Sequence, residues 1–231
     1  MILAAAIALI GCSKEIQYKT VEVVLQNASM EANIAGDEAY NFLNEGFVGF
    51  KTDAEDRGAA KAFFGTDGNL SMQVKVNVNA TQLWAYTKGA INKVQTFALP
   101  AETWYSEIAD FSSMVYCSKA ATIAGQDKVT AVVEGITAGV RLQIVDSRGD
   151  LAGKPVKSVT IESTDPEYPL IGNVSLNFTR PGISAITDGK AAVTVHTMPA
   201  DNANSTLSVG TIAEPSEVGV VVLPCTFKGK V

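Results

Sequence analysis

Apolar and polar side chains alternate with a period of two residues along much of this sequence. The clearest example is the segment 70–79, which is expected to be a β-strand. Every second residue there is apolar: Leu70, Met72, Val74, Val76 and Val78. Successive side chains of a strand point to opposite faces of its sheet, so this segment is predicted to have one buried and one wet face.

Shorter runs of the same kind follow along the chain and end in residues that favour turns. In the first half, strands are predicted at 46–50, 82–86, 94–99, 112–117 and 129–134. In the second half, they are predicted at 140–145, 159–161, 174–178, 191–195, 219–223 and 225–231. Turn sequences such as Ser147-Arg148-Gly149-Asp150 separate them. Only the segment 36–43 suggests a short helix.

The composition agrees with an all-β fold. The chain is 47% hydrophobic but only 7% aromatic, which is typical of many short strands joined by polar turns. The spacing of strands and turns favours Greek-key β-sandwiches. We expect two of them in tandem, at 12–136 and 137–231. The alternation continues to Val231, so the last strand has an open edge unless the chain continues or a partner covers it.

The amino terminus predicts export and lipidation. Residues 2–10 form an apolar run that ends in Leu9-Ile10-Gly11-Cys12. Such a run is too short for a membrane-spanning helix, which needs about 20 residues, but it suits a signal peptide. We therefore predict a lipoprotein signal peptide at 1–11 and an acylated Cys12 that anchors the chain at the outer membrane. No Lys or Arg precedes the run, which leaves open that Met1 is internal to a longer reading frame.

Charge and the remaining cysteines limit the partners. The net charge is −6 and no basic cluster is longer than a pair, so binding to nucleic acid is not expected. Cys117 and Cys225 have two interpretations that the sequence leaves open. They either form a disulfide in an oxidising periplasm or are two buried thiols that act as small apolar side chains.

No arrangement of residues predicts a catalytic, metal or cofactor site. The single histidine, His196, is expected on the outward face of its strand if Val193 and Val195 point inward, and no Ser or Asp partner is apparent. The acidic cluster at 53–56 lacks the glycine-centred loop and closing glutamate of a calcium site. Glycosidase carboxylates meet only in space and leave no local trace. We expect a protein that is not an enzyme.

Six segments carry a resemblance to a known family. They are LIGC at 9–12 with the following SKE, FALP at 97–100, AGVRLQIVDS at 138–147, KPVKSVTIEST at 154–164, PLIGNVSLNF at 169–178 and LPCTFKGKV at 223–231. In these segments the chain resembles the fimbrillins of Bacteroides-type envelopes, which build type V pili. The resemblance extends over the chain from about residue 94 and is weak between 12 and 70.

This resemblance implies two transthyretin-like sandwich domains, a lipidated precursor and assembly with other fimbrial subunits by strand exchange. In such families a protease cuts after Arg or Lys and frees an amino-terminal strand. The segment 20–25 fits a donor strand, since Val21, Val23 and Leu25 share one face. Arg57 is the candidate for the cut, although a lone Arg in a polar loop is usually only solvated. A surplus pair of strands after the second domain is missing, which leaves open a tip, anchor or non-polymerising relative.

A second hypothesis is a surface glycan-binding lipoprotein of a polysaccharide uptake system. Such a protein needs an exposed aromatic platform on which sugar rings stack. The candidates are Trp84, Tyr86, Trp104 and Tyr105. Trp84 and Tyr86 share one face of a predicted strand, but paired aromatics in a strand belong to a core more often than to a binding site.

Overall fold

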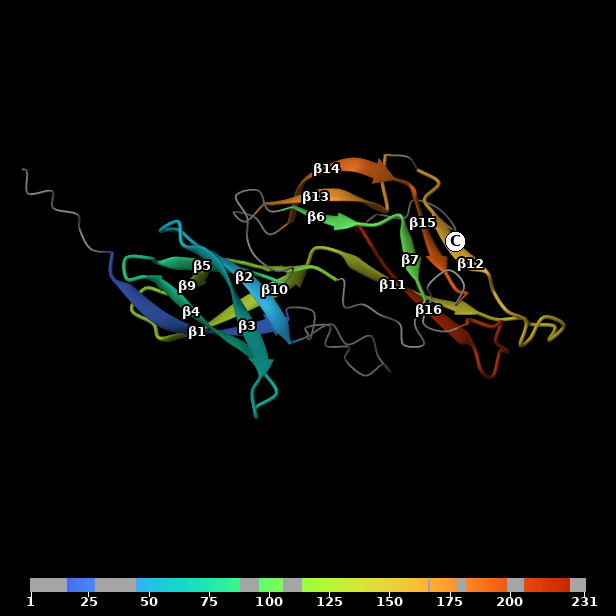
Figure 1. The fold of residues 1–231 in the computed structure, drawn as a ribbon, viewed down its shortest axis with the longest axis horizontal. Coiled ribbons are helices and arrows are strands. Elements are labelled where there is room, and N and C mark those ends of the chain that lie inside the picture. Colours follow the sequence, from blue (N-terminus) through green and yellow to red (C-terminus); the bar gives the residue numbers. More distant parts are fainter. Residues whose placement is uncertain are drawn as a thin grey trace, which may run out of the picture.

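Figure 1 shows the fold in a computed structural model, which describes residues 16–27, 45–87, 96–105, 114–165, 167–177, 182–198 and 206–224. Every regular element of these residues is a strand, so the predicted all-β class is confirmed. The strands are β1 Tyr18–Asn27, β2 Gly46–Thr52, β3 Arg57–Phe64, β4 Leu70–Asn77, β5 Gln82–Tyr86, β6 Thr96–Leu99, β7 Glu102–Trp104, β8 Tyr116–Ser118, β9 Ala121–Thr122, β10 Lys128–Gly135, β11 Ala138–Ile144, β12 Ser158–Glu162, β13 Ile171–Asn177, β14 Gly182–Lys190, β15 Ala192–His196 and β16 Ser216–Val222. The helix expected at 36–43 lies outside the described residues.

Strands of the first half close into a barrel-like sheet, on the left of Figure 1. They follow the order β2-β3-β4-β1-β10-β8-β5, and β5 pairs back with β2 to complete the ring. All neighbours in this ring are antiparallel except β1 and β10, which are parallel. The closure differs from the predicted first sandwich. It is favourable because a closed sheet has no row of unpaired backbone groups at an edge.

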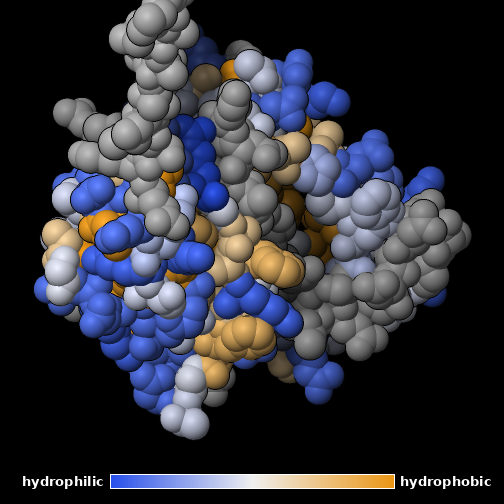
Figure 2. All heavy atoms as spheres, turned by 60° about the vertical axis from the view of Figure 1, so that its left-hand side comes forward, coloured by the Kyte–Doolittle hydropathy of each residue, from blue (hydrophilic) through white to orange (hydrophobic). Residues whose placement is uncertain are grey.

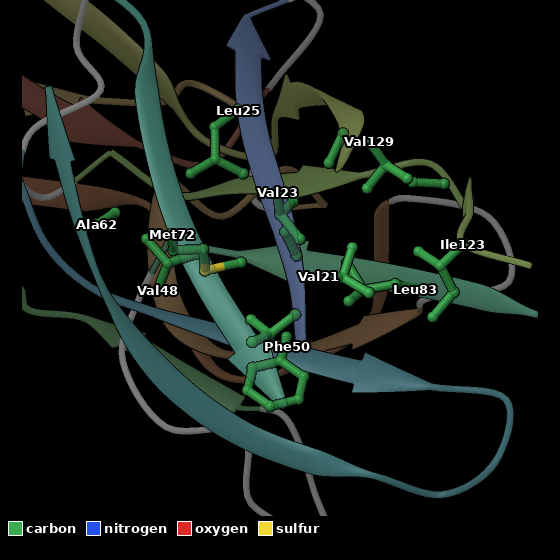
Figure 3. Packing of buried hydrophobic residues seen from close by; sticks show 14 of the residues in the cluster. Val21, Val23, Leu25, Val48, Phe50, Ala62, Met72, Leu83, Ile123 and Val129 are labelled. Carbon is green, nitrogen blue, oxygen red and sulfur yellow. The ribbon is translucent and has the colours of Figure 1, made fainter. Parts of the chain in front are cut away.

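Alternation along the strands fills the barrel with apolar side chains. On β4, the predicted residues Leu70, Met72, Val74 and Val76 are at most 2% exposed. Val78 does not continue the pattern, because β4 ends at Asn77 and Val78 is 40% exposed. Figure 3 shows side chains from β1, β2 and β5 gathered in the same interior. Each fully buried aliphatic side chain contributes roughly 1.5–3 kcal/mol.

Within its described residues, the second half of the molecule forms three small sheets around a second core. The sheets are β11-β16, β12-β15-β7 and β14-β13-β6. Their inward side chains include Val174, Val193, Val195, Val218 and Val220, all at most 2% exposed. This half lies on the right of Figure 1. The expected inward orientation of Val193 and Val195 is thereby confirmed.

The two cores meet at strands β5 and β8 of the barrel. Tyr86, Val115 and Cys117 lie near or on these strands, yet they belong to the second core. Tyr116, in contrast, packs inside the barrel. The outer face of the barrel at this place is therefore buried against the second half.

The strands group differently from the expected division at residue 136. The segment 96–104 was expected in the first domain, but β6 pairs with β13 and β7 pairs with β15 of the second half. Sequence alternation identifies a strand but not its neighbour in the sheet, so a strand that crosses from one half to the other gives no local signal.

Truncation of the barrel core should destabilise the protein strongly. Leu83 is fully buried, and we expect Leu83→Ala to lower the free energy of unfolding by about 2–5 kcal/mol, because it loses apolar burial and leaves a cavity. The matched control is Ile212→Ala, at a residue that is 71% exposed, which should change it by less than about 0.5 kcal/mol. Urea unfolding of both variants measures this, and equal effects would contradict the barrel interior described above.

Candidate functional site

The predicted donor strand is part of β1, which lies between β4 and β10 in the sheet of the barrel. Strand β1 pairs with β4 along eight residues, from Tyr18 to Leu25, and with β10 along six, from Glu22 to Asn27. The side chains of Val21, Val23 and Leu25 are at most 3% exposed, so their shared face is confirmed and points into the barrel. Exchange of this strand between subunits stays a prediction.

A salt bridge and a long-range hydrogen bond fix the register of β1. The ammonium group of Lys128 on β10 lies 2.8 Å from the carboxylate of Glu22 on β1, and the two residues are direct cross-strand partners. Hydrogen bonding to Glu22 raises the pKa of Lys128. The Lys19 ammonium donates to the carbonyl oxygen of Ile123 at 2.6 Å. Because Glu22 and Lys128 face each other only in one register, a slip along β10 would separate them.

Arg57 does not lie in a polar loop, as the sequence suggested, but is the first residue of β3. It stands opposite Lys51 in the β2–β3 hairpin, and its guanidinium contacts the Glu55 carboxylate at 2.7 Å. A turn joins the two strands, with Glu55 at a φ of 66°. The hydrophobic pattern did not indicate this strand, because residues 57–62 are mostly small. Whether a protease cuts here stays a prediction.

Two carboxylates of the acidic cluster, Asp53 and Asp56, hydrogen-bond this hairpin to neighbouring parts of the barrel. Asp56 accepts hydrogen bonds from the Thr52 hydroxyl at 3.0 Å and from the Asn77 backbone N–H at 2.7 Å. Asp53 accepts from the backbone N–H groups of Thr81 and Gln82 at 2.9 and 3.0 Å, and also from the Thr81 hydroxyl. These carboxylates therefore connect the hairpin to β4 and to the start of β5.

The four candidate aromatics do not form one platform. Tyr86 is 2% exposed, and burial together with the nearby Cys117 thiol raises its pKa to about 12. Trp84 and Tyr105 are half-buried and pack against the second core. Trp104, in contrast, is 52% exposed. The sheet pairing thus separates the four residues, since Trp84 and Tyr86 lie on β5 and Trp104 on β7.

Trp104 lies beside the single histidine. The two residues are direct partners on β7 and β15, and their rings stack at 6.3 Å between centroids and 30° between planes. The Nε2 atom of His196 is 3.6 Å from a carboxylate oxygen of Glu102, whose side chain is 69% exposed. Trp104 and Glu102 lie 92 and 94 positions before His196 in the chain, so no local sequence pattern indicates this contact.

A second group of exposed apolar side chains lies on the outside of the β2–β3 hairpin. Phe47 and Phe63 are 63% and 48% exposed, and the Lys61 ammonium lies 4.9 Å from the ring centroid of Phe63. Figure 2 turns the barrel toward the reader and shows such apolar patches among a mostly hydrophilic surface. Single exposed apolar side chains are common on protein surfaces, so these two residues alone indicate no binding site.

Of the cysteines, the structure describes Cys117. Its thiol is fully buried, and burial followed by the charge of Glu134 raises its pKa to about 12. A thiol with so high a pKa is unreactive at neutral pH. Cys12 and Cys225 lie outside the described residues, so acylation of Cys12 and the Cys117–Cys225 pair stay predictions.

Two kinds of feature are missing from the part of the chain that the structure describes. It contains no group of three or more His, Cys, Asp or Glu side chains placed to hold a metal ion. Nor does it contain a helix with the length and hydrophobicity needed to cross a membrane.

In fold, the chain is similar to the solved structure of a candidate cell adhesion protein from Bacteroides ovatus. The TM-score is 0.56 at 11% sequence identity, and the likeness covers 90% of this chain and 79% of that chain. At such identity the likeness shows the fold alone. Because it covers nearly the whole chain, the shared fold includes both the barrel and the second half. No family model matches the sequence, and the search of curated proteins finds no match.

Asp53 should make stability depend on pH. Partial burial raises its pKa, but the hydrogen bonds from Thr81 and Gln82 outweigh this, so the pKa lies below its ordinary value of 3.8. A carboxylate with a lowered folded-state pKa stabilises the fold above its unfolded-state pKa, and this contribution is lost as the pH falls through the folded value. We expect Asp53→Asn to lower the free energy of unfolding by about 1 kcal/mol at pH 7 and by less below about pH 4.

Urea unfolding of wild type and variant at pH 7 and pH 3 measures this difference. Asp150→Asn, at an exposed position, is the matched control and should have little effect at either pH. A cost of Asp53→Asn that is equal at both pH values, or larger at pH 3, would show that the charged form of Asp53 does not stabilise the turn.

Proposed function

We propose that this chain is a cell-surface adhesion protein. The observation that carries the proposal is the shared fold, over 90% of the chain, with the candidate adhesion protein of Bacteroides ovatus. The resemblance of the sequence to fimbrillins points in the same direction from independent features, namely the motifs at 9–12, 138–147 and 223–231.

We further propose that it is a subunit or accessory lipoprotein of fimbriae, held at the outer membrane through an acylated Cys12. Only five residues separate Cys12 from the start of β1 at Tyr18. An extended chain spans at most about 3.6 Å per residue, so a lipid on Cys12 would hold β1 within roughly 20 Å of the membrane surface. The barrel would then be the membrane-proximal part of the subunit.

In this proposal, subunits assemble by strand exchange at β1: a strand of the next subunit takes the place that β1 leaves in the barrel. The inward side chains Val21, Val23 and Leu25 are the kind that strand addition uses, since main-chain bonds supply affinity and alternate side chains fill pockets. Their neighbours across the sheet are apolar as well: Val74, Met72 and Leu70 on β4, and Val129 and Ala131 on β10. A vacated β1 position would therefore be an apolar groove between β4 and β10.

The distribution of basic residues determines what a cut would release. Between Asn27 and Lys51 the sequence contains no Lys or Arg, and Lys51 already lies inside β2. A protease specific for basic residues therefore cannot separate β1 from residues 46–51 of β2. Cleavage after Arg57 would leave β1 and β2 as one fragment, held by its pairing with β3, β4, β5 and β10. This fragment would stay bound until a competing strand displaces it.

A denaturing gel tests the proposal. Purified protein treated with an arginine-specific protease should form a ladder of higher-mass species when it is not boiled, because a donated strand buries its side chains as β1 does. The cut terminus, identified by mass spectrometry, should follow Arg57. Arg57→Ala should form no ladder, and Arg148→Ala, in an exposed turn, should behave as wild type. Cut protein that stays monomeric at high concentration would contradict assembly by strand exchange.

A further inference from the structure

The outward face of the sheet β12-β15-β7 carries two rows of three side chains. Each of the three strands contributes one side chain to each row. Cross-strand pairing places Ser158, His196 and Trp104 in one row and Thr160, Thr194 and Glu102 in the next. We call these six residues the Trp104 face. The opposite side of β15 is buried in the second core through Val193 and Val195, which are 1% exposed. The core therefore holds the backbone of this face in place.

The indole of Trp104 is held in place without being covered. Strand β7 is fixed to β15 on both sides of Trp104, since the backbone N–H of Thr194 donates to Ala101 at 2.8 Å and that of Tyr105 donates to His196 at 2.9 Å. The His196 ring supports the indole from the side. An aromatic ring that is 52% exposed on such a support is preorganised to stack on a ligand.

The polar groups of the Trp104 face include both donors and acceptors. The Glu102 carboxylate accepts only, the imidazole of His196 can do both, and the hydroxyl groups of Thr160 and Thr194 hydrogen-bond to each other at 3.0 Å. A sugar ring matches this set of groups, because it has an apolar C–H face for the indole and hydroxyl groups at its rim.

From this arrangement we propose that the Trp104 face binds carbohydrate, with one pyranose ring stacked on Trp104 and its hydroxyl groups bonded to Glu102 and His196. The inference rests on the proposed adhesive role, for which the carbohydrate is the ligand. Glu102 and Glu162 both lie on this side of the sheet. Their negative charges repel uronic acids, so the ligand is a neutral sugar.

Isothermal titration calorimetry of the uncut, monomeric protein tests this inference. The probes are short neutral oligosaccharides of glucose, mannose and galactose, with an oligogalacturonide as the acidic counterpart. At least one neutral probe should bind, and Trp104→Ala should weaken it about tenfold or more, which corresponds to about 1.4 kcal/mol. Glu102→Ala should weaken it as well. Phe47→Ala, at an exposed aromatic residue on the barrel, is the matched control and should bind as wild type.

Three results would overturn the inference: no binding of any neutral probe, equal binding by Trp104→Ala and wild type, or an equal loss in Phe47→Ala. Thermal unfolding of each variant shows that its fold is intact, which is expected because both aromatic residues are exposed. The gel ladder reports assembly and the calorimeter reports sugar binding on the uncut chain. A protein that binds sugar but forms no ladder would refute strand exchange alone, and the reverse result would refute the carbohydrate site alone.

Discussion

The pairing of β1 on both of its edges is the constraint on which the barrel depends. This strand is antiparallel to β4 and parallel to β10, so it joins the hairpins of residues 46–86 to the returning strands of residues 116–135. Without β1 the ring would open between β4 and β10, and two rows of backbone groups would lose their partners. The same double pairing makes β1 costly to remove, and any strand exchange must replace what β1 supplies.

The second half depends on the barrel in turn, because the outer face of β5 and β8 is part of its core. Tyr86 and Cys117 are buried there so completely that the pKa of each is raised to about 12. Strands β6 and β7 follow the barrel strand β5 in sequence and pair with β13 and β15. This crossing brings Glu102 and Trp104 next to His196, so the exposed aromatic face results from the way the two halves are joined.

Alternation in the sequence predicted the strands whose faces differ most in polarity. The segments 82–86 and 129–134 coincide with β5 and β10 almost to the residue. It missed β3, whose inward residues are small, and β14, of which seven residues are exposed. Pairing was not predictable at all, because no local pattern encodes which strands become neighbours. For this reason the closed barrel, and the meeting of Trp104, His196 and Glu102, required the structure.

Hydrogen exchange of the backbone amides of Val21 to Leu25 tests the central position of β1 most directly. If β1 is paired on both edges, these amides should exchange only when the whole barrel unfolds, with an opening free energy equal to that from urea unfolding. Amides of Val129 to Val133 on β10 provide the reference within the same molecule. If the β1 amides exchange with a much lower opening free energy while those of β10 stay protected, β1 is not held on both edges.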